Sequence, residues 1–230
     1  MRFSKLIATL LPLALVPMAL AQDPMQPMQP QDSPAQDAAK VSTYSLRRAA
    51  VKGQKLRYKL TANVDADGKP ISVRAVVTEE VTDTLAGGDF QVKSVQTEVV
   101  TSVDGQEEAT PDDPGNLITY NALGDVTAIK LLGGIVSSKE WRLANLGIVH
   151  APDSPVAVGE AWTYKIAGKQ DQGVDATAEY KVLGLEKIGG RMTVKISAKV
   201  KETTGSTPAS SDGTIWLDAQ DFSMVKTEAT

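Results

Sequence analysis

The sequence predicts a mainly β protein: a curved antiparallel sheet or unclosed β-barrel of two related meanders, with a short helix over its concave face. Three observations lead to this prediction. Apolar and polar residues alternate over several long runs, turn residues stand where those runs stop, and the two halves of the chain share weak similarity.

The alternating runs have the period of two that is typical of strands. Apolar side chains recur at every second position over 56–64 and 71–77 in the first half, and over 162–166 and 192–200 in the second. The intervening positions are mostly polar and include many lysines and threonines. One apolar and one polar face indicate antiparallel strands that are buried on one side and wet on the other.

Turn residues separate these runs. Asp65–Pro70 lies between the first two runs, and glycine-containing pairs mark later breaks at Gly87–Asp89, Asp104–Gly105 and Gly189–Arg191. Glycine readily adopts the positive φ that tight hairpins need. We therefore expect a hairpin at each of these breaks.

One segment departs from the alternating pattern. A serine that can serve as an N-cap opens it, Trp141 and Leu143 recur with apolar neighbours at helical spacing, and Gly147 follows. We expect a short helix over Ser138–Leu146, lying across the open face of the sheet.

The halves of the chain resemble each other in four blocks that occur in the same order. The matching pairs are Gly53–Leu60 with Gly159–Ile166, Gly87–Lys93 with Gly189–Lys195, Ile118–Ala122 with Ile215–Ala219, and Val126–Lys130 with Phe222–Lys226. The alternative is that any two amphipathic meanders look alike. If the repeat is real, meanders of about four strands each cover about 41–130 and 156–230, and a helical connector covers about 131–155.

The first forty residues are unlike the rest. Residues 1–21 have a basic start at Arg2 and Lys5, an apolar run and a small-x-small ending at Ala21, which is the pattern of a cleaved signal peptide. A membrane anchor is the alternative, but the run is short and holds two prolines. Residues 22–40 are rich in proline, glutamine and aspartate, which is typical of a disordered linker.

This organisation predicts a location. With the leader removed, residues 41–230 form a single β-rich domain without a transmembrane span. We expect the protein to be exported to the periplasm or the extracellular space.

Composition narrows the classes of function. There is no cysteine, so disulfides, thiol nucleophiles and thiolate metal sites are excluded. A single histidine excludes zinc sites that need two or three imidazoles. The formal net charge of −4 gives no electrostatic case for nucleic acid as a partner. We expect no metal and no cofactor.

No familiar catalytic motif is present in the sequence. As a catalytic base, His150 would need a partner such as Asp153 or Glu160, and a serine. The alternative is a partly exposed loop histidine at a seam within the domain. We expect a protein that is not an enzyme and has no catalytic residues.

Five aromatic residues are the candidates for a ligand pocket: Tyr58, Trp141, Trp162, Tyr164 and Trp216. They lie in the predicted strands and helix, and Tyr58 and Tyr164 occupy matching positions of the two halves. Either they fill the core, with the helix tryptophan plugging the sheet, or they line a hydrophobic pocket. Both interpretations involve the same residues, so they stay open at this point.

Part of the second half resembles known families. Pro152–Trp162 and Tyr180–Glu186 resemble segments of exported bacterial β-proteins of unknown function. Gly213–Asp218 followed by Phe222–Lys226 is similar to a strand pair of those families and of the lipoprotein-localisation carrier (LolA/LolB-like) superfamily. That resemblance implies an unclosed β-barrel whose mouth is closed by helices and which holds acyl chains. It carries over no ligand-binding residue, and the linker stands where such carriers have an amphipathic helix.

Two functions therefore follow as expectations. The first is an exported, non-enzymatic binding protein that holds an apolar or lipidic ligand in the concave face of the sheet. The second is a structural or interaction protein of the cell envelope, with a filled core, an envelope protein as its partner and no ligand.

Overall fold

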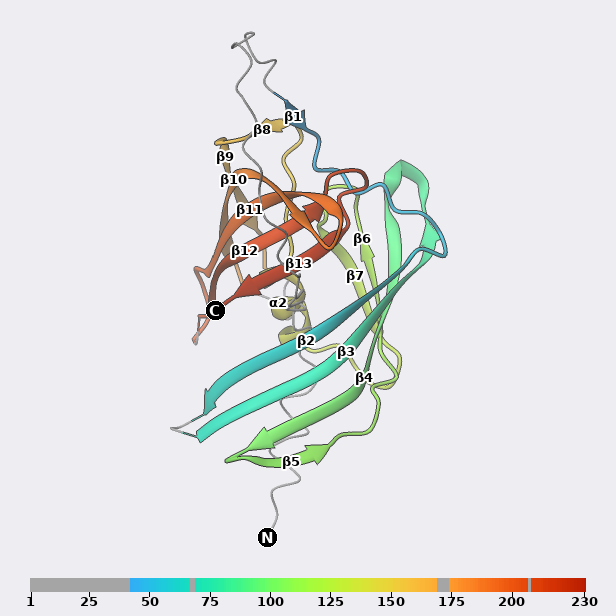
Figure 1. Ribbon diagram of the computed structural model, residues 1–230, viewed down its shortest axis with the longest axis vertical. Helices are drawn as coiled ribbons and strands as arrows, with labels where there is room; N and C mark the ends of the chain where they lie inside the picture. Colours follow the sequence, from blue (N-terminus) through green and yellow to red (C-terminus); the bar gives the residue numbers. More distant parts are fainter. Residues whose placement is uncertain (1–41, 67–68, 169–173, 207) are drawn as a thin grey trace, which may run out of the picture.

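The computed structural model describes residues 42–66, 69–168, 174–206 and 208–230. The predicted leader 1–21 and linker 22–40 lie outside these described residues. Within them the chain is mainly β, and its curved antiparallel sheets are not closed into a barrel (Figure 1). The predicted fold class is confirmed.

The first half of the chain forms one meander. Its strand order is β2-β3-β4-β6-β7, with β5 paired to β4. The strands are β2 (Lys55–Ala66), β3 (Lys69–Thr84), β4 (Phe90–Val103), β5 (Gln106–Ala109), β6 (Asn116–Tyr120) and β7 (Val126–Leu131), and a 3-10 turn (Ala86–Gly88) joins β3 to β4.

The second half forms another meander, with the order β9-β10-β11-β12-β13. Its strands are β9 (Ala161–Ile166), β10 (Ala176–Ile188), β11 (Arg191–Glu202), β12 (Ser210–Asp218) and β13 (Met224–Ala229). A separate pair, β1 (Thr43–Tyr44) with β8 (Val156–Ala157), ties the start of the described chain to the segment just before β9. The meanders thus form two sheets and not one shared sheet, because no strand of one is hydrogen-bonded to a strand of the other within the described residues.

Turn chemistry explains two of the hairpins. Ile188 pairs with Arg191 across Gly189 and Gly190, both at positive φ. The β4–β5 turn through Asp104 and Gly105 has the same two-residue form, again with both φ values positive. Such turns match the right-handed twist of the strands, so both hairpin predictions are confirmed. The tip of the β2–β3 turn lies outside the described residues.

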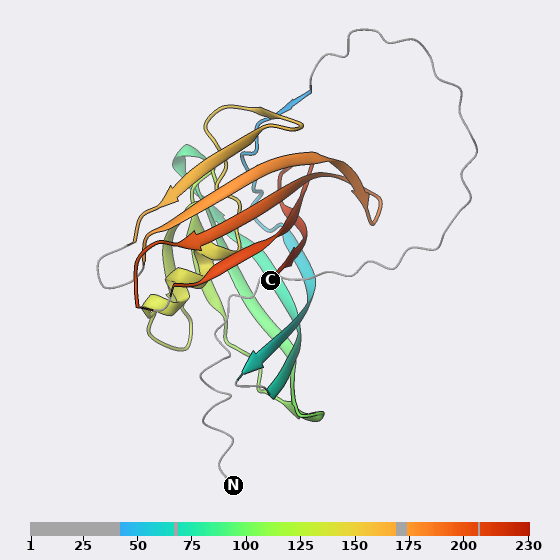
Figure 2. The same cartoon turned by 90° about the vertical axis from the view of Figure 1, so that its left-hand side faces the viewer.

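The only α-helix in the described residues, α2, spans Ser138–Leu146, as predicted. The backbone N–H of Ser137 donates to the Glu140 carboxylate at 2.7 Å, and the Ser137 hydroxyl also bonds it, which starts the helix. Trp141 and Ala144 are buried in a cluster with side chains of β6 and β7. Figures 1 and 2 show α2 between the two sheets.

The blocks that match between the halves occupy corresponding strands. Gly53–Leu60 leads into β2 and Gly159–Ile166 into β9, the first strand of each sheet. The later blocks fall on β4 and β11, β6 and β12, and β7 and β13. The shared strand order agrees with a repeat, and the duplication itself stays a prediction.

Candidate functional site

The β6–β7 turn is held rigid by its own side chains. Asn121 Oδ1 accepts hydrogen bonds from the backbone N–H groups of Leu123 and Asp125, both at 2.9 Å. Asn121 Nδ2 donates to Asp125 Oδ2 at 2.7 Å. Gly124 has φ +93°, and a Cβ at this position would lie 2.5 Å from the carbonyl oxygen of Val149. Glycine therefore lets the connector pass close to the turn.

The connector after α2 packs His150 against this turn. His150 Nδ1 lies 2.7 Å from Asp125 Oδ1, and the Ala151 N–H donates to the Leu123 carbonyl at 2.8 Å. The imidazole stacks on the ring of Tyr164, with centroids 4.5 Å apart and planes 5° from parallel. Only 1% of His150 is exposed. The seam between the two halves of the chain is therefore polar at its centre and buried.

Aromatic side chains of the second sheet form hydrogen bonds with the connector backbone. The Trp162 indole N–H donates to the His150 carbonyl at 2.8 Å, and the Tyr180 hydroxyl donates to the Ile148 carbonyl at 3.0 Å. The two rings stack with centroids 5.1 Å apart. These bonds fix the backbone on both sides of the histidine ring.

Burial and hydrogen bonds set the protonation of Asp125 and Tyr164. Burial by itself would raise the pKa of the Asp125 carboxyl, but hydrogen bonds from His150, Asn121 and Tyr164 outweigh it and lower that pKa. Burial, followed by the hydrogen bond to Asp125, raises the pKa of the Tyr164 hydroxyl to about 12. Asp125 is thus an ionised acceptor near neutral pH, and the tyrosine is a neutral donor.

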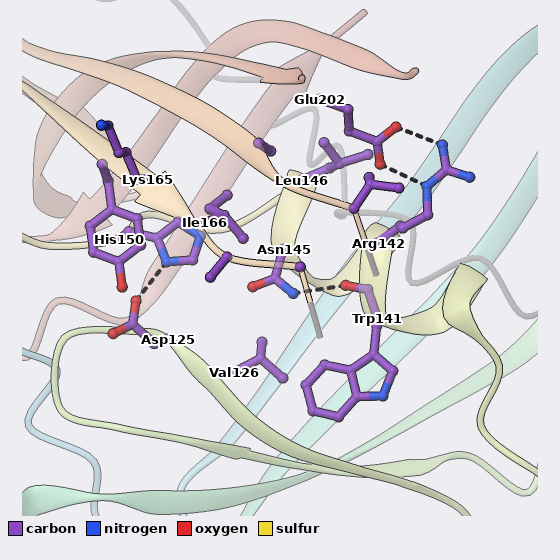
Figure 3. Close-up of a pocket in the computed structure, with 15 residues that line it drawn as sticks. Asp125, Val126, Trp141, Arg142, Asn145, Leu146, His150, Lys165, Ile166 and Glu202 are labelled. Atoms are coloured by element: carbon purple, nitrogen blue, oxygen red, sulfur yellow. Dashed lines mark hydrogen bonds and ion pairs between the residues drawn. The ribbon is translucent and has the colours of Figure 1, made fainter. Parts of the chain in front are cut away.

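A cavity of about 230 Å³ lies beside this cluster, between α2 and the start of the second sheet (Figure 3). Its apolar lining comes from both sheets and the helix: Val126, Trp141, Leu146, Ile166, Val174 and Ala176. Asp125, His150 and Tyr164 bound one side, and Asn145 projects from the helix. The cavity therefore joins an apolar wall to hydrogen-bonding groups.

An ion pair lines the opposite side of the cavity. Arg142 of α2 binds Glu202 of β11 through two hydrogen bonds, of 2.7 and 2.6 Å. The backbone N–H of Ala209 also donates to Glu202 at 2.6 Å. Burial would raise the pKa of Glu202, but these bonds outweigh it and the pKa is lowered. The pair links the helix to the second sheet, and its positive and negative charges compensate each other.

The five aromatic candidates do not share one site. Trp141 and Tyr164 line the cavity of about 230 Å³. Trp162 lies next to it and holds the connector. Tyr58 belongs to the first sheet, where its hydroxyl donates to the Met224 carbonyl at 2.9 Å. Trp216 does not line the cavity.

Trp216 is buried, with 3% of it exposed, but it lies on the face of the second sheet opposite to the apolar core cluster. Its neighbours in β12, Ile215 and Leu217, belong to the core cluster, and successive side chains of a strand point to opposite faces. Lys195 and Lys226 cover the indole at 5.2 and 4.6 Å from the ring centroid. The presence of a tryptophan in an alternating strand therefore did not predict which face of the sheet its side chain occupies.

His150 differs from both sequence interpretations. It is buried, not partly exposed, and its partner is Asp125. Asp153 instead pairs with Arg47, and Glu160 accepts the backbone N–H of Ala157. The seam placement itself agrees with the expectation.

Sequence reasoning missed the polar residues of the site. Asp125 had a usable signal, because Asn and Gly before an aspartate predict a compact turn whose side-chain bonds stay local. Arg142 and Glu202 had none, since a pair separated by 60 residues leaves no local pattern.

A second polar cluster lies farther into the space between the sheets. Glu79 of β3 borders two smaller cavities of about 70 and 80 Å³, together with Tyr120 and Met224. Burial raises the pKa of the Glu79 carboxyl, although Arg48 and a hydrogen bond with Tyr58 act against the shift. The space between the sheets therefore contains a polar group, Glu79, and two small cavities that side chains do not fill.

Comparisons with models of protein families, with curated proteins and with solved structures give no match to this chain. In the described part of the chain, no group of three or more His, Cys, Asp or Glu side chains is arranged to hold a metal ion. Within the same residues, no helix has the length and apolar character needed to cross a membrane.

Proposed function

We propose that this is an exported, non-enzymatic binding protein that takes up a small ligand with an apolar body in the cavity between α2 and the second sheet. One observation carries the proposal: a cavity of about 230 Å³ with an apolar wall is bounded by polar groups that are already fixed by their own partners. Small-molecule sites commonly have this composition, a mostly apolar lining with a few oriented polar groups.

The volume limits the ligand. An engineered cavity of about 150 Å³ accommodates benzene, whereas drug-sized ligands occupy about 300–1,000 Å³. By this scale, a cavity of about 230 Å³ suits a compound of roughly nine non-hydrogen atoms. The size favours a small ring or a short chain over the complete lipid that the resemblance to lipoprotein-localisation carriers suggested.

The proposed location rests on the predicted leader 1–21. Cleavage after Ala21 would release the chain to the periplasm or the extracellular space, where the ligand would come from the envelope or the medium. The second expectation, an envelope interaction protein without a ligand, becomes the alternative outcome of the test below.

The test uses NMR on the exported chain, with benzyl alcohol as the probe. Binding in the cavity is expected to shift the indole N–H signal of Trp141 in a saturable way. Ala167 is exposed at the cavity rim, so Ala167→Trp should block the shift without disturbing the core. Ala161→Trp, at the other exposed end of β9, is the matched control and should leave the shift intact.

The outcome separates the two functions. A saturable shift that is lost only in Ala167→Trp supports ligand binding. If benzyl alcohol shifts no cavity signal up to its solubility limit, the binding function fails, and a ligand-free interaction protein becomes the better interpretation.

A further inference from the structure

One polar atom at the cavity is left without a partner. His150 Nε2 is buried and, among the described residues, no group forms a hydrogen bond with it. Buried polar atoms are almost always hydrogen-bonded, because an unsatisfied one has lost its water without replacement. His150 is also one of the residues that line the cavity of about 230 Å³.

The ring that carries this atom cannot turn freely. Its Nδ1 lies 2.7 Å from Asp125 Oδ1, and its face lies flat on Tyr164. In Figure 3 the other ring nitrogen is on the side of the imidazole away from Asp125, toward Ile166. The direction of Nε2 is therefore set by the fold before any ligand arrives.

The chemistry of Nε2 follows from Asp125. An ionised carboxylate only accepts hydrogen bonds, so Nδ1 must carry the proton that joins it to Asp125. In the neutral ring, Nε2 is then left with a lone pair and acts as an acceptor. When the imidazole is neutral, a ligand atom that meets Nε2 must donate.

The polar groups nearby have the same character. The Nδ2 group of Asn145 donates to the Trp141 carbonyl at 2.8 Å, which assigns its Oδ1 as the remaining acceptor. Asp125 adds a negative charge. Two cations also line the cavity, but Arg142 is held by Glu202, and Lys165 is an exposed residue of β9.

We infer that His150 Nε2 is the recognition point of the cavity and that the ligand carries a hydrogen-bond donor, a hydroxyl or an amine, at the end of an apolar body. Carboxylates of the same size bind more weakly at this point, because they bring an acceptor and a negative charge close to Nε2, Asn145 Oδ1 and the Asp125 carboxylate. This inference rests on the proposed function and names the class of ligand.

The experiment compares four probes of nearly equal size: benzyl alcohol, benzylamine, toluene and benzoate. Dissociation constants come from titrating the Trp141 indole signal. The two donors should bind at least about tenfold more tightly than toluene and benzoate, which corresponds to roughly one net hydrogen bond. In the unmodified protein, benzyl alcohol should also shift the ¹⁵N resonance of His150 Nε2, and toluene should not.

A variant isolates the histidine. His150→Phe keeps a ring for stacking on Tyr164 and removes the acceptor, so benzyl alcohol and toluene should then bind equally. If this variant does not fold, the ¹⁵N shift in the unmodified protein still decides the role of Nε2.

The possible failures are distinct. If none of the four probes shifts the Trp141 signal, the proposed binding function itself falls. If benzoate or toluene binds as well as the donors, the cavity binds ligands but the donor inference is wrong. If benzyl alcohol and benzylamine bind more tightly than toluene and benzoate but the Nε2 resonance does not shift, His150 is not the recognition point.

Discussion

The two sheets bury their side chains in different ways. In the described residues, the second sheet and its connector share one continuous apolar cluster, whose members include Val182, Val194 and Ile196 with no exposed surface. The first sheet divides its buried side chains among three smaller clusters, one of them made jointly with α2. The difference indicates that the second sheet carries most of the packing energy, and that α2 and the His150 seam are among the contacts that hold the first sheet to it.

The largest expected effect tests this contrast with the same substitution in each sheet. Val182→Ala, in the continuous cluster, removes two buried carbon groups and should lower the free energy of unfolding by about 2–3 kcal/mol. Val77→Ala, beside a cavity of about 70 Å³ in the first sheet, should cost about 1 kcal/mol less, because fewer contacts surround it. Urea unfolding measures both, and equal losses would contradict the contrast.

The next effect tests the link between α2 and the second sheet. Arg142→Met leaves Glu202, which is 2% exposed, with a buried charge and one remaining backbone donor, so we expect a loss of about 2 kcal/mol. Replacing Glu202 by methionine as well should restore more than half of it. Arg57→Met, in the exposed pair with Glu98, is the control and should cost under about 1 kcal/mol. A single variant no worse than this control would mean that the pair does not hold the helix.

A smaller effect depends on pH at the seam. The Asp125 carboxyl has a lowered pKa in the folded protein, so its contribution is present above the unfolded value of about 3.9 and is lost as the pH falls through the folded pKa. Asp125→Asn should cost about 1 kcal/mol at neutral pH, and this difference should shrink toward about pH 3. Urea unfolding over that range checks it; a difference independent of pH would rule out an ionised Asp125 as the source.

The smallest effect has the opposite sign and belongs to the first sheet. The pKa of Glu79 is raised, so folding favours its protonated form and the stability of the protein falls as the pH rises through that value. Glu79→Gln cannot ionise and should therefore gain melting temperature relative to the unmodified protein as the pH increases. Melting curves from about pH 4 to about pH 8 measure the gain, and a gain that shrinks with rising pH would be inconsistent with a buried carboxyl.

Local patterns predicted the local structure well. The alternation over 192–200 appears as β11, the glycine pairs gave two hairpins, and the helix over Ser138–Leu146 has the predicted bounds. Each of these depends on residues that are close in the sequence, where side-chain period and turn preference act directly. The division into two sheets was not predicted, because the alternation of apolar and polar residues does not determine whether the edge strands of the two meanders pair with each other.

The site was harder to predict for the same reason. Trp141 and Tyr164 were chosen for their size and do line the cavity, whereas Trp216 has the same size and faces the other way. Asp125 and Glu202 matter through partners 25 and 60 residues away. Such partnerships arise only when the sheets are assembled, so a pattern within one strand does not reveal them.

The pairing of β1 with β8 has a consequence for how the chain is made. The segment that leads from β1 to the first meander is held by the second half: Leu46 belongs to the core cluster of the second sheet, and the Ala49 N–H donates to the Asp221 carbonyl at 2.9 Å. Synthesis proceeds from the N-terminus, so the first hundred residues emerge before the anchors for their own beginning exist. The half that is made first is thus completed last, because its opening segment can be anchored only after Asp221 has been synthesised.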